Sequence, residues 1–310
     1  MGKRKNRYKP LKNLVFVWGR MGAIIVLRLA RVIPLKNLYQ LGELLGTVGY
    51  YLMRKRKYIA YHNLKTVFGS LKTEKECNKI VKEIFCDAVN NALEIAKVAC
   101  TNPVVLKEMV SIEGLEYLND ALSQGKGTVA ISAHMGNFLL IGPRLIIEGY
   151  PFSLIARDPK DKVLAHTLQG MRTTLGLESI PDQPRKTCVA RSLVALKRNS
   201  ILYLQLDQNA SSQDLWVDFF GWLVPTFRGP VVFSMRTGAP ITPMFIVRET
   251  RYHHRLIITP PFQLESTDNK ENDILRNTAN LTKLIESYIQ QYPTQWWWFH
   301  RRWKKAKKII

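Results

Sequence analysis

The stretch Gly127–Phe138 reads GTVAISAHMGNF, and both the fold and the candidate site can be worked outward from it. Within it, Thr128–Ser132 is short, β-branched and apolar, which predicts a buried strand. His134 follows at once, and Phe138–Glu148 then has the apolar spacing of a helix, broken only by Gly142-Pro143. A histidine between a strand and a helix lies at the rim of a sheet, where it can take a proton from a hydroxyl nucleophile. A histidine satisfied within a turn is the alternative interpretation.

Strand-like and helix-like stretches alternate after residue 127. This alternation predicts an α/β fold with a central mixed, partly parallel sheet flanked by helices. The predicted strands are Thr128–Ser132, Phe152–Ala156, Ile201–Gln205, Ile241–Val247 and Arg255–Ile258. The predicted helices are Phe138–Glu148, Lys162–Leu175, Lys186–Lys197, Gly229–Thr237 and Asn272–Gln291. Upstream, Tyr58–Asn102 reads as amphipathic helices with a capping box at Thr73 and Glu76, and Ile112–Gly125 reads as a further helix.

The net charge of +22 lies at the two ends of the 310-residue chain. Residues 1–60 carry 14 Lys and Arg and one acid, residues 301–310 carry six Lys and Arg, and the 240 residues between them hold 26 bases and 23 acids. A nucleic-acid-binding protein would more naturally carry a basic stripe on its folded body. Bases that flank apolar, Trp-rich segments are typical of an anionic membrane surface. We therefore expect a membrane surface, and no nucleic acid, as a partner.

The first 57 residues are predicted to form a basic, amphipathic, membrane-associating region ahead of an α/β domain at 58–310. Leu14–Ile33 is apolar but holds three arginines, and its longest uncharged stretch, Met21–Leu27, is too short to span a bilayer. Leu35–Met53 is a second apolar segment, followed by four bases at 54–57. Helices that lie along or dip into the membrane fit this pattern, and a single tilted span is the alternative.

The C-terminal segment combines aromatic and basic residues. The segment Trp296–Lys308 reads WWWFHRRWKKAKK, which suits a bilayer interface or a C-terminal strap that packs on the domain. The four cysteines form no CxxC pair and no zinc-like cluster with histidine, so we expect small buried residues, no metal and no cofactor.

Three further stretches place polar residues after predicted strands. Arg157 follows one strand, where it can hold a carboxylate or phosphate, and Asp207 and Gln208 follow another. Ligands of open α/β sheets usually bind at the carboxyl ends of strands. A third stretch runs from Phe219-Phe220-Gly221 to Thr226-Phe227-Arg228-Gly229-Pro230. Its glycines and prolines permit close approach of the backbone to a ligand, and Arg228 can bind an anion.

The order of the motifs SAHMGNF, IARDPK, LDQ, VDFFG, TGAPITPMF and WWWFHRRWK resembles a family of enzymes. It is similar to the lysophospholipid acyltransferase type, in particular the lauroyl and myristoyl acyltransferases of bacterial lipid A biosynthesis, over about 58–304. The resemblance implies a glycerolipid acyltransferase-like fold and transfer of an acyl group from acyl carrier protein to a hydroxyl of an anionic, phosphorylated glycolipid. It also implies a location at the cytoplasmic face of the bacterial inner membrane.

What the resemblance implies for the site is that His134 acts as general base on the acceptor hydroxyl. Backbone amides or an arginine would stabilise the oxyanion. The candidate substrate-binding residues are Asn137, Arg157, Gln208 and Arg228.

The chain departs from the motif of this family at one position. The family has an acid five residues after the histidine, and this chain has Leu139 there. Loss of an orienting carboxylate in a related site costs on the order of 10⁴ in rate. Asp207 or a backbone carbonyl is expected to supply the acceptor for the imidazole, and Leu139 as an introduced substitution is a further explanation. The alternatives are a catalytically silent protein that binds lipid or carrier protein, or an acyltransferase for a different anionic glycolipid.

Overall fold

A seven-stranded mixed sheet forms the centre of the protein. The computed structural model describes residues 22, 25, 28–30, 32–102, 104–211 and 214–308. The strand order is β1 (Val110–Glu113), β9 (His254–Ile258), β8 (Ile241–Arg248), β2 (Thr128–Ser132), β5 (Ile201–Gln205), β3 (Phe152–Ala156) and β4 (Glu178–Pro181). Strands β8, β2, β5, β3 and β4 run parallel, and β9 is antiparallel to β8 and parallel to β1. The structure confirms the predicted α/β class and its partly parallel sheet.

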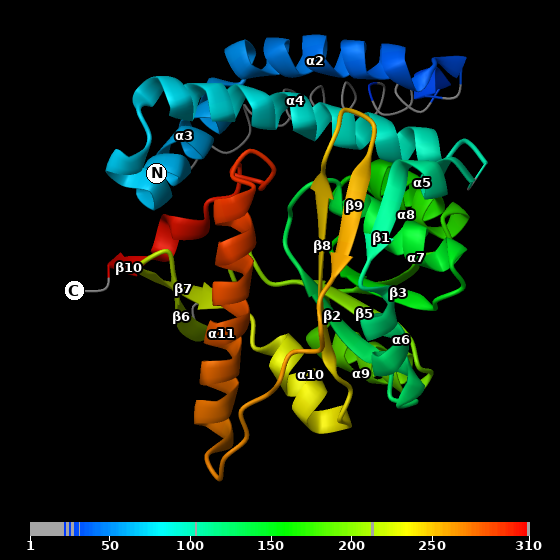
Figure 1. Ribbon diagram of the computed structural model, residues 1–310, viewed down its shortest axis with the longest axis vertical. Helices are drawn as coiled ribbons and strands as arrows, with labels where there is room; N and C mark the ends of the chain where they lie inside the picture. Colours follow the sequence, from blue (N-terminus) through cyan, green and yellow to red (C-terminus); the bar gives the residue numbers. More distant parts are fainter. Residues whose placement is uncertain are drawn as a thin grey trace, which may run out of the picture.

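Helices cover both faces of this sheet because successive side chains of a buried strand point to opposite faces. Val129 and Ile131 of β2 pack in one core with α9 (Arg185–Lys197), α10 (Gly229–Thr237) and α11 (Lys270–Gln291). Ala130 packs in a second core on the opposite face. The helices of that second face are α5 (Val104–Met109), α6 (Leu115–Ser123), α7 (Ile141–Ile147) and α8 (Lys162–Thr174). The result is a three-layered arrangement (Figure 1).

Among the described residues of the N-terminal part, three helices complete the fold. They are α2 (Leu35–Leu52), α3 (Arg54–Phe68) and α4 (Glu74–Val98), with the short turn η1 (Gly69–Leu71) before α4. The Thr73 and Glu76 capping box predicted from the sequence is present at the start of α4. Helix α2 lies along the outer side of α4, and the two run across one edge of the molecule (Figure 1). Gly46 allows this approach, since a Cβ there would lie 2.4 Å from Cα of Cys86.

A small second sheet and the C-terminal residues pack beside the main sheet. The strands are β6 (Leu215–Phe219), β7 (Trp222–Thr226) and β10 (Lys307–Lys308), and η3 (Arg302–Lys305) precedes β10. Trp296 and Trp298 are fully buried, which favours the packed-strap interpretation of this segment over an aromatic belt for these two residues. Phe220 and Gly221 form the β6–β7 hairpin turn, with φ of 54° and 76°, so this stretch turns a strand.

The structure also corrects one predicted element. The predicted helix Ile112–Gly125 is wrong at its start, because β1 occupies Val110–Glu113 and α6 begins only at Leu115. Gly114 separates them with φ of 77°, and a Cβ there would lie 2.0 Å from the carbonyl oxygen of Ile258. Strands β1, β4, β6, β7 and β10 were not predicted, and the first turn of Phe138–Glu148 is the 3₁₀ helix η2 (Phe138–Leu140).

The N-terminal predictions are tested only in part. Most of Leu14–Ile33 lies outside the described residues, and Leu35–Met53 corresponds to α2. Among the residues that the structure describes, no helix combines the length and the apolar character needed to cross a bilayer. The proposed boundary at residue 57 stays a prediction.

Candidate active site

His134 lies in the turn that follows the carboxyl end of β2. Its backbone oxygen accepts a hydrogen bond of 2.8 Å from the N–H of Trp297, and Met135 forms a β-bridge with Trp296. Gly136 has φ of 53°, and a Cβ there would lie 2.2 Å from the carbonyl oxygen of Ile246. The turn after His134 therefore requires glycine, and it is fixed between β8 and the C-terminal segment.

Asp207 faces His134 from the neighbouring strand end. Oδ1 of Asp207 is 2.9 Å from Nδ1 of His134, and Oδ2 accepts the backbone N–H of His134 at 3.0 Å. The same Oδ2 accepts the indole N–H of Trp296 at 2.8 Å. The structure thus brings His134 and Asp207 together, with a third contact from the C-terminal segment.

These contacts set the charge state of Asp207. Complete burial would raise the pKa of Asp207, but the nearby imidazole and the hydrogen bonds from His134 and Trp296 outweigh it and hold the pKa at about 2. An ionised carboxylate only accepts hydrogen bonds, so Nδ1 of His134 carries the proton. Nε2 is left with a lone pair, and no described group hydrogen-bonds to it. The His134 side chain is 20% exposed, so a substrate hydroxyl can reach it.

Leu139 occupies the place of the motif acid in the chain. Its side chain is 41% exposed and lines an apolar cavity. The hydrogen bond that an acid would make to the imidazole is made by Asp207. The Asp207 contact expected from the sequence is therefore present in the geometry.

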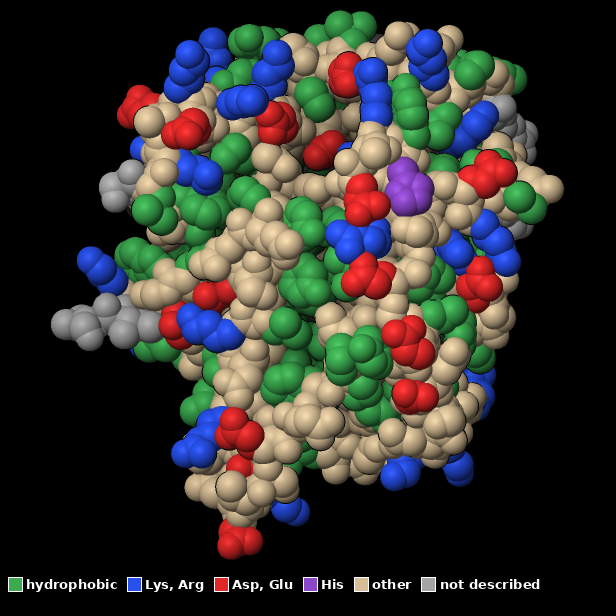
Figure 2. Space-filling view, in the orientation of Figure 1, with side chains coloured by type: hydrophobic (Ala, Val, Ile, Leu, Met, Phe, Trp, Pro, Cys, Tyr) green, Lys and Arg blue, Asp and Glu red, His purple; other side chains and the backbone are tan. Residues whose placement is uncertain are grey.

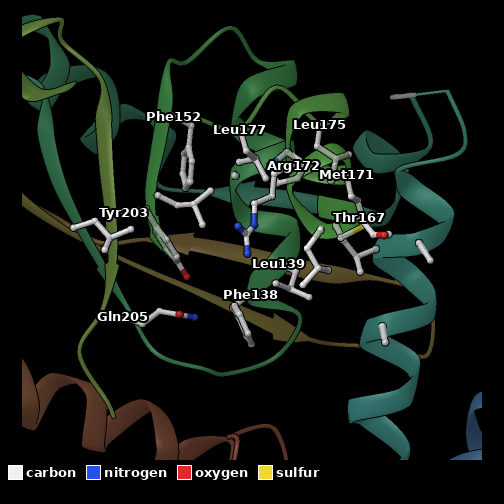
Figure 3. A pocket seen from close by; sticks show the side chains of 18 of the residues that line it. Phe138, Leu139, Phe152, Thr167, Met171, Arg172, Leu175, Leu177, Tyr203 and Gln205 are labelled. Atoms are coloured by element: carbon white, nitrogen blue, oxygen red, sulfur yellow. The ribbon is translucent and has the colours of Figure 1, made fainter. Parts of the chain in front are cut away.

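The apolar cavity has a volume of about 440 Å³ and lies between the sheet, α4, α7 and α8. Phe138 and Gln205 stand at one end of it, and Phe152, Leu175 and Leu177 at the other (Figure 3). The Phe138 ring also meets the His134 ring edge to face at a centroid distance of 4.9 Å. The cavity therefore starts next to the imidazole and has the walls that an alkyl chain needs.

Two polar groups of the cavity wall matter for chemistry. Nε2 of Gln205 is buried and has no hydrogen-bond partner among the described residues. Burial raises the pKa of Tyr203, so its hydroxyl stays protonated at neutral pH. Gln205 precedes Asp207 by two residues at the end of β5. No sequence signal separated this glutamine from an ordinary strand residue.

A buried polar network supports the turn after His134. Asn137 has no exposed surface, and its amide N–H donates to Glu94 at 2.6 Å. Arg248 and His254 bind the same carboxylate at 2.6 and 3.1 Å. Burial would raise the pKa of Glu94, but its bonds to His254 and Arg248 lower it, so the group is ionised. Asn91 adds a bond of 2.8 Å to the Gly136 carbonyl oxygen. Asn137 is therefore part of the buried hydrogen-bond network that supports the site, and it has no surface exposed to a substrate.

The other candidate residues hydrogen-bond to groups other than His134 and Asp207. Arg157 is exposed and paired with Asp182, whose Oδ2 accepts a hydrogen bond of 2.6 Å from Nε of Arg157. Arg228 pairs with Glu271 at 3.0 Å. The carbonyl oxygen of Gln208 accepts from buried Arg302 at 2.9 Å. Their roles in substrate binding stay predictions. The described residues contain no group of three or more His, Cys, Asp or Glu placed to hold a metal.

The comparisons with known proteins agree with a lipid-modifying enzyme. The family model described as bacterial lipid A biosynthesis acyltransferase matches residues 5–305, so the chain belongs to this family. The lipid A biosynthesis palmitoleoyltransferase of Escherichia coli is 25% identical over 275 residues, covering 88% of this chain and 86% of that protein. The lauroyltransferase of the same organism is 25% identical over 290 residues, with coverage of 93% and 92%.

Two further proteins match over a smaller part of the chain or at lower sequence identity. A phosphatidylinositol mannoside acyltransferase of Mycolicibacterium smegmatis is 25% identical over 207 residues, 64% of each chain. Among solved structures, the 1-acyl-sn-glycerophosphate acyltransferase of Thermotoga maritima aligns over 81% of this chain and 95% of that chain. Its sequence identity is 15% and its TM-score 0.36.

Proposed function

We propose that this protein transfers a fatty acyl group from acyl carrier protein to a hydroxyl of a phosphorylated glycolipid, a lipid A precursor. The observation that carries the proposal is the contact of 2.9 Å between His134 and buried Asp207, next to an apolar cavity. A base with an orienting carboxylate suits an alcohol nucleophile, and the cavity suits the acyl chain of the donor. Membership of the lipid A acyltransferase family supports the reaction class.

In this mechanism Nε2 of His134 removes the proton from the acceptor hydroxyl as its oxygen attacks the thioester carbonyl. A new C–O bond forms, and the carbonyl π electrons move to oxygen. When the tetrahedral intermediate collapses, the C–S bond breaks and the thiol of the carrier leaves with the proton that His134 held. Asp207 stabilises the imidazolium and keeps the proton of Nδ1 in place. Acyl carrier protein and acceptor supply all the atoms.

The developing oxyanion needs a hydrogen-bond donor that is already in position. We assign this role to the Nε2 amide of Gln205, which is buried at the cavity end nearest Phe138 and has an unused donor. A buried donor without a partner is costly, so a group that meets it only during the reaction explains its presence.

The proposal places the protein at the cytoplasmic face of the inner membrane. One side of α2 packs on α4, and its other side exposes Leu44, Val48 and Leu52 at helical spacing. Hydrophobic side chains lie beside Lys and Arg along the edge that α2 forms at the top of Figure 2. Such a mixed edge is typical of helices that lie in the interface of an anionic bilayer.

Vesicle binding tests this placement. The double variant Val48→Gln/Leu52→Gln should lose most of its affinity for vesicles that contain anionic phospholipid. Val194→Gln/Leu275→Gln is the matched control, because its side chains are also exposed but lie on α9 and α11. Equal retention of both variants on the vesicles would refute a role for α2.

The enzymatic proposal is tested by acyl transfer from acylated carrier protein to a lipid A precursor. The unaltered chain should turn over, and His134→Ala should be inactive while its thermal unfolding stays close to that of the unaltered chain. A mannosylated phosphatidylinositol is assayed in parallel, because one relative is named for that substrate. A chain that binds lipid but transfers no acyl group to either acceptor is a binding protein, and the catalytic proposal is then wrong.

A further inference from the structure

A second pocket, which we call the basic pocket, lies between α3 and the C-terminal segment. Its volume is about 390 Å³. The residues that line it are Arg56, Gln208, Asn209, Trp297, Phe299, His300, Arg301 and Lys304. It shares no lining residue with the apolar cavity.

The basic pocket gathers cations whose charge is not balanced by the protein. Arg56, Arg301 and Lys304 form no ion pair with any acid of the described chain, and the one side-chain bond of Arg56 runs to the carbonyl oxygen of Phe299 at 3.3 Å. Arg157, in contrast, is already paired with a carboxylate. Three unpaired cations around one hollow attract an anion.

His300 lines the same pocket with its ring. Its Nδ1 is buried and has no hydrogen-bond partner among the described residues. Burial lowers the pKa of His300 to about 4, against the opposing charge of Asp207, so the ring is neutral at pH 7. The His300 ring therefore adds no positive charge to the pocket at this pH. The three unpaired cations of the lining are the groups that indicate a polar, anionic ligand.

The basic pocket also adjoins the candidate active site. Gln208 is the residue after Asp207, and the backbone N–H of Trp297 donates to His134 at 2.8 Å. The apolar cavity reaches the same pair through Phe138 and Gln205. The His134–Asp207 pair is therefore linked through neighbouring residues to both the apolar cavity and the basic pocket.

We propose that the basic pocket binds a phosphate group of the acceptor glycolipid and so presents the acceptor hydroxyl to His134. This inference rests on the proposed function. Arg56 belongs to α3, which begins two residues after the exposed Leu52 at the end of α2. An anion site next to an exposed apolar helix face suits the head group of a lipid whose chains stay in the bilayer. The donor's phosphopantetheine arm is the other phosphate source, and the test separates the two.

The test uses the full chain in detergent micelles and measures equilibrium binding of a phosphorylated lipid A precursor. The double variant Arg301→Gln/Lys304→Gln should bind this lipid roughly tenfold or more weakly, because charge-assisted bonds to phosphate are lost. The double variant should bind the dephosphorylated lipid as tightly as the unaltered chain does. Its affinity for acyl carrier protein should also equal that of the unaltered chain. The matched control Arg185→Gln/Lys186→Gln removes two exposed charges from α9 and should bind like the unaltered chain.

Each other outcome is informative. Equal binding by the double variant and its control overturns the proposal, and so does a loss confined to acyl carrier protein, which would assign the pocket to the donor. Binding does not require turnover, so His134→Ala should bind the phosphorylated lipid normally. If that binding depends on Arg301 and Lys304 but no acyl transfer occurs, the pocket stands and the proposed activity fails. If transfer occurs and the double variant keeps its KM for the acceptor, the activity stands and the pocket assignment fails.

Discussion

Replacing Asp207 by asparagine should reverse the polarity of the contact that orients His134. The side chains have nearly the same shape, so the carboxamide oxygen can still accept from Trp296 and from the backbone N–H of His134, as Oδ2 does now. The NH₂ group then faces Nδ1 of the imidazole, where Oδ1 stood 2.9 Å away. Nδ1 must become the acceptor, the proton moves to Nε2, and the general base is lost.

The expected loss of activity depends on the electrostatics of Asp207 and on the tautomer of His134. The pKa of Asp207 is about 2 instead of 3.8, and this difference corresponds to roughly 2–3 kcal/mol of preferential interaction with the carboxylate. A tautomer fixed in the wrong form costs on the order of 10⁴ in kcat in a related histidine–carboxylate site. We therefore expect kcat to fall by about 10³ to 10⁴, with the KM for both substrates changed little.

The assay is acyl transfer from acylated carrier protein to a lipid A precursor, at several concentrations of each substrate. Asp268→Asn is the control, because Asp268 is exposed in the loop before α11 and the substitution removes the same charge. Thermal unfolding of both variants shows whether the fold is kept. A folded Asp207→Asn protein whose kcat stays within tenfold of the unaltered chain would refute the assignment of Asp207 as the orienting carboxylate.

Three further predictions concern the active site and the basic pocket. Leu139→Glu should lower kcat/KM about tenfold or more, because it puts a carboxylate into the wall of the apolar cavity while Asp207 already holds the imidazole; a rise in turnover would contradict this. Gln205→Leu should lower kcat on the order of 10²-fold with the KM unchanged, as expected for an oxyanion donor, and unchanged kcat in steady-state assays would exclude that role. The unfolding free energy should fall as pH drops from about 6.5 to 4, because His300 has its pKa lowered to about 4 and takes up its proton first in the unfolded chain. The unfolding free energy should fall further from about pH 4 to 2, as Asp207 loses its charge. Measured by chemical denaturation, the unfolding free energy of His300→Gln should change less between about pH 6.5 and 4 than that of the unaltered chain.

The elements that the sequence predicted best are those buried on both faces of the sheet. Strands β2, β3 and β5 begin and end where expected, because each is a short apolar run bounded by turn residues. The strand β1 was missed because its four residues merge with the apolar pattern of the helix that follows. Only the contact of Gly114 with Ile258, distant in the chain, shows that the helix cannot start earlier. Such a boundary depends on tertiary packing and has no local signal.

The residues that can carry chemistry were predictable where they follow strands, and their contacts with the C-terminal segment were not. His134 and Asp207 were both expected from their positions at strand ends, since adjacent parallel strands bring their carboxyl ends to one edge. The third contact, from Trp296, lies 89 residues further along the chain than Asp207. The sequence left a bilayer interface and a packed strap both open for this tryptophan, and its indole N–H donates to a buried carboxylate. The basic pocket joins α3 to residues near 300, which no spacing rule connects.

The presence of leucine at position 139 follows from the number of bonds that an imidazole can make. Nδ1 has one hydrogen to donate, and Asp207 accepts it. A second acid at 139 would find no donor there. It would stand instead in the wall of a cavity whose other lining is mostly apolar, where a charge has an energetic cost and an acyl chain has less to contact. Leucine at that position forms part of the apolar wall. The departure from the family motif is therefore consistent with an intact base–carboxylate pair, in which the acid follows β5 and does not lie in η2.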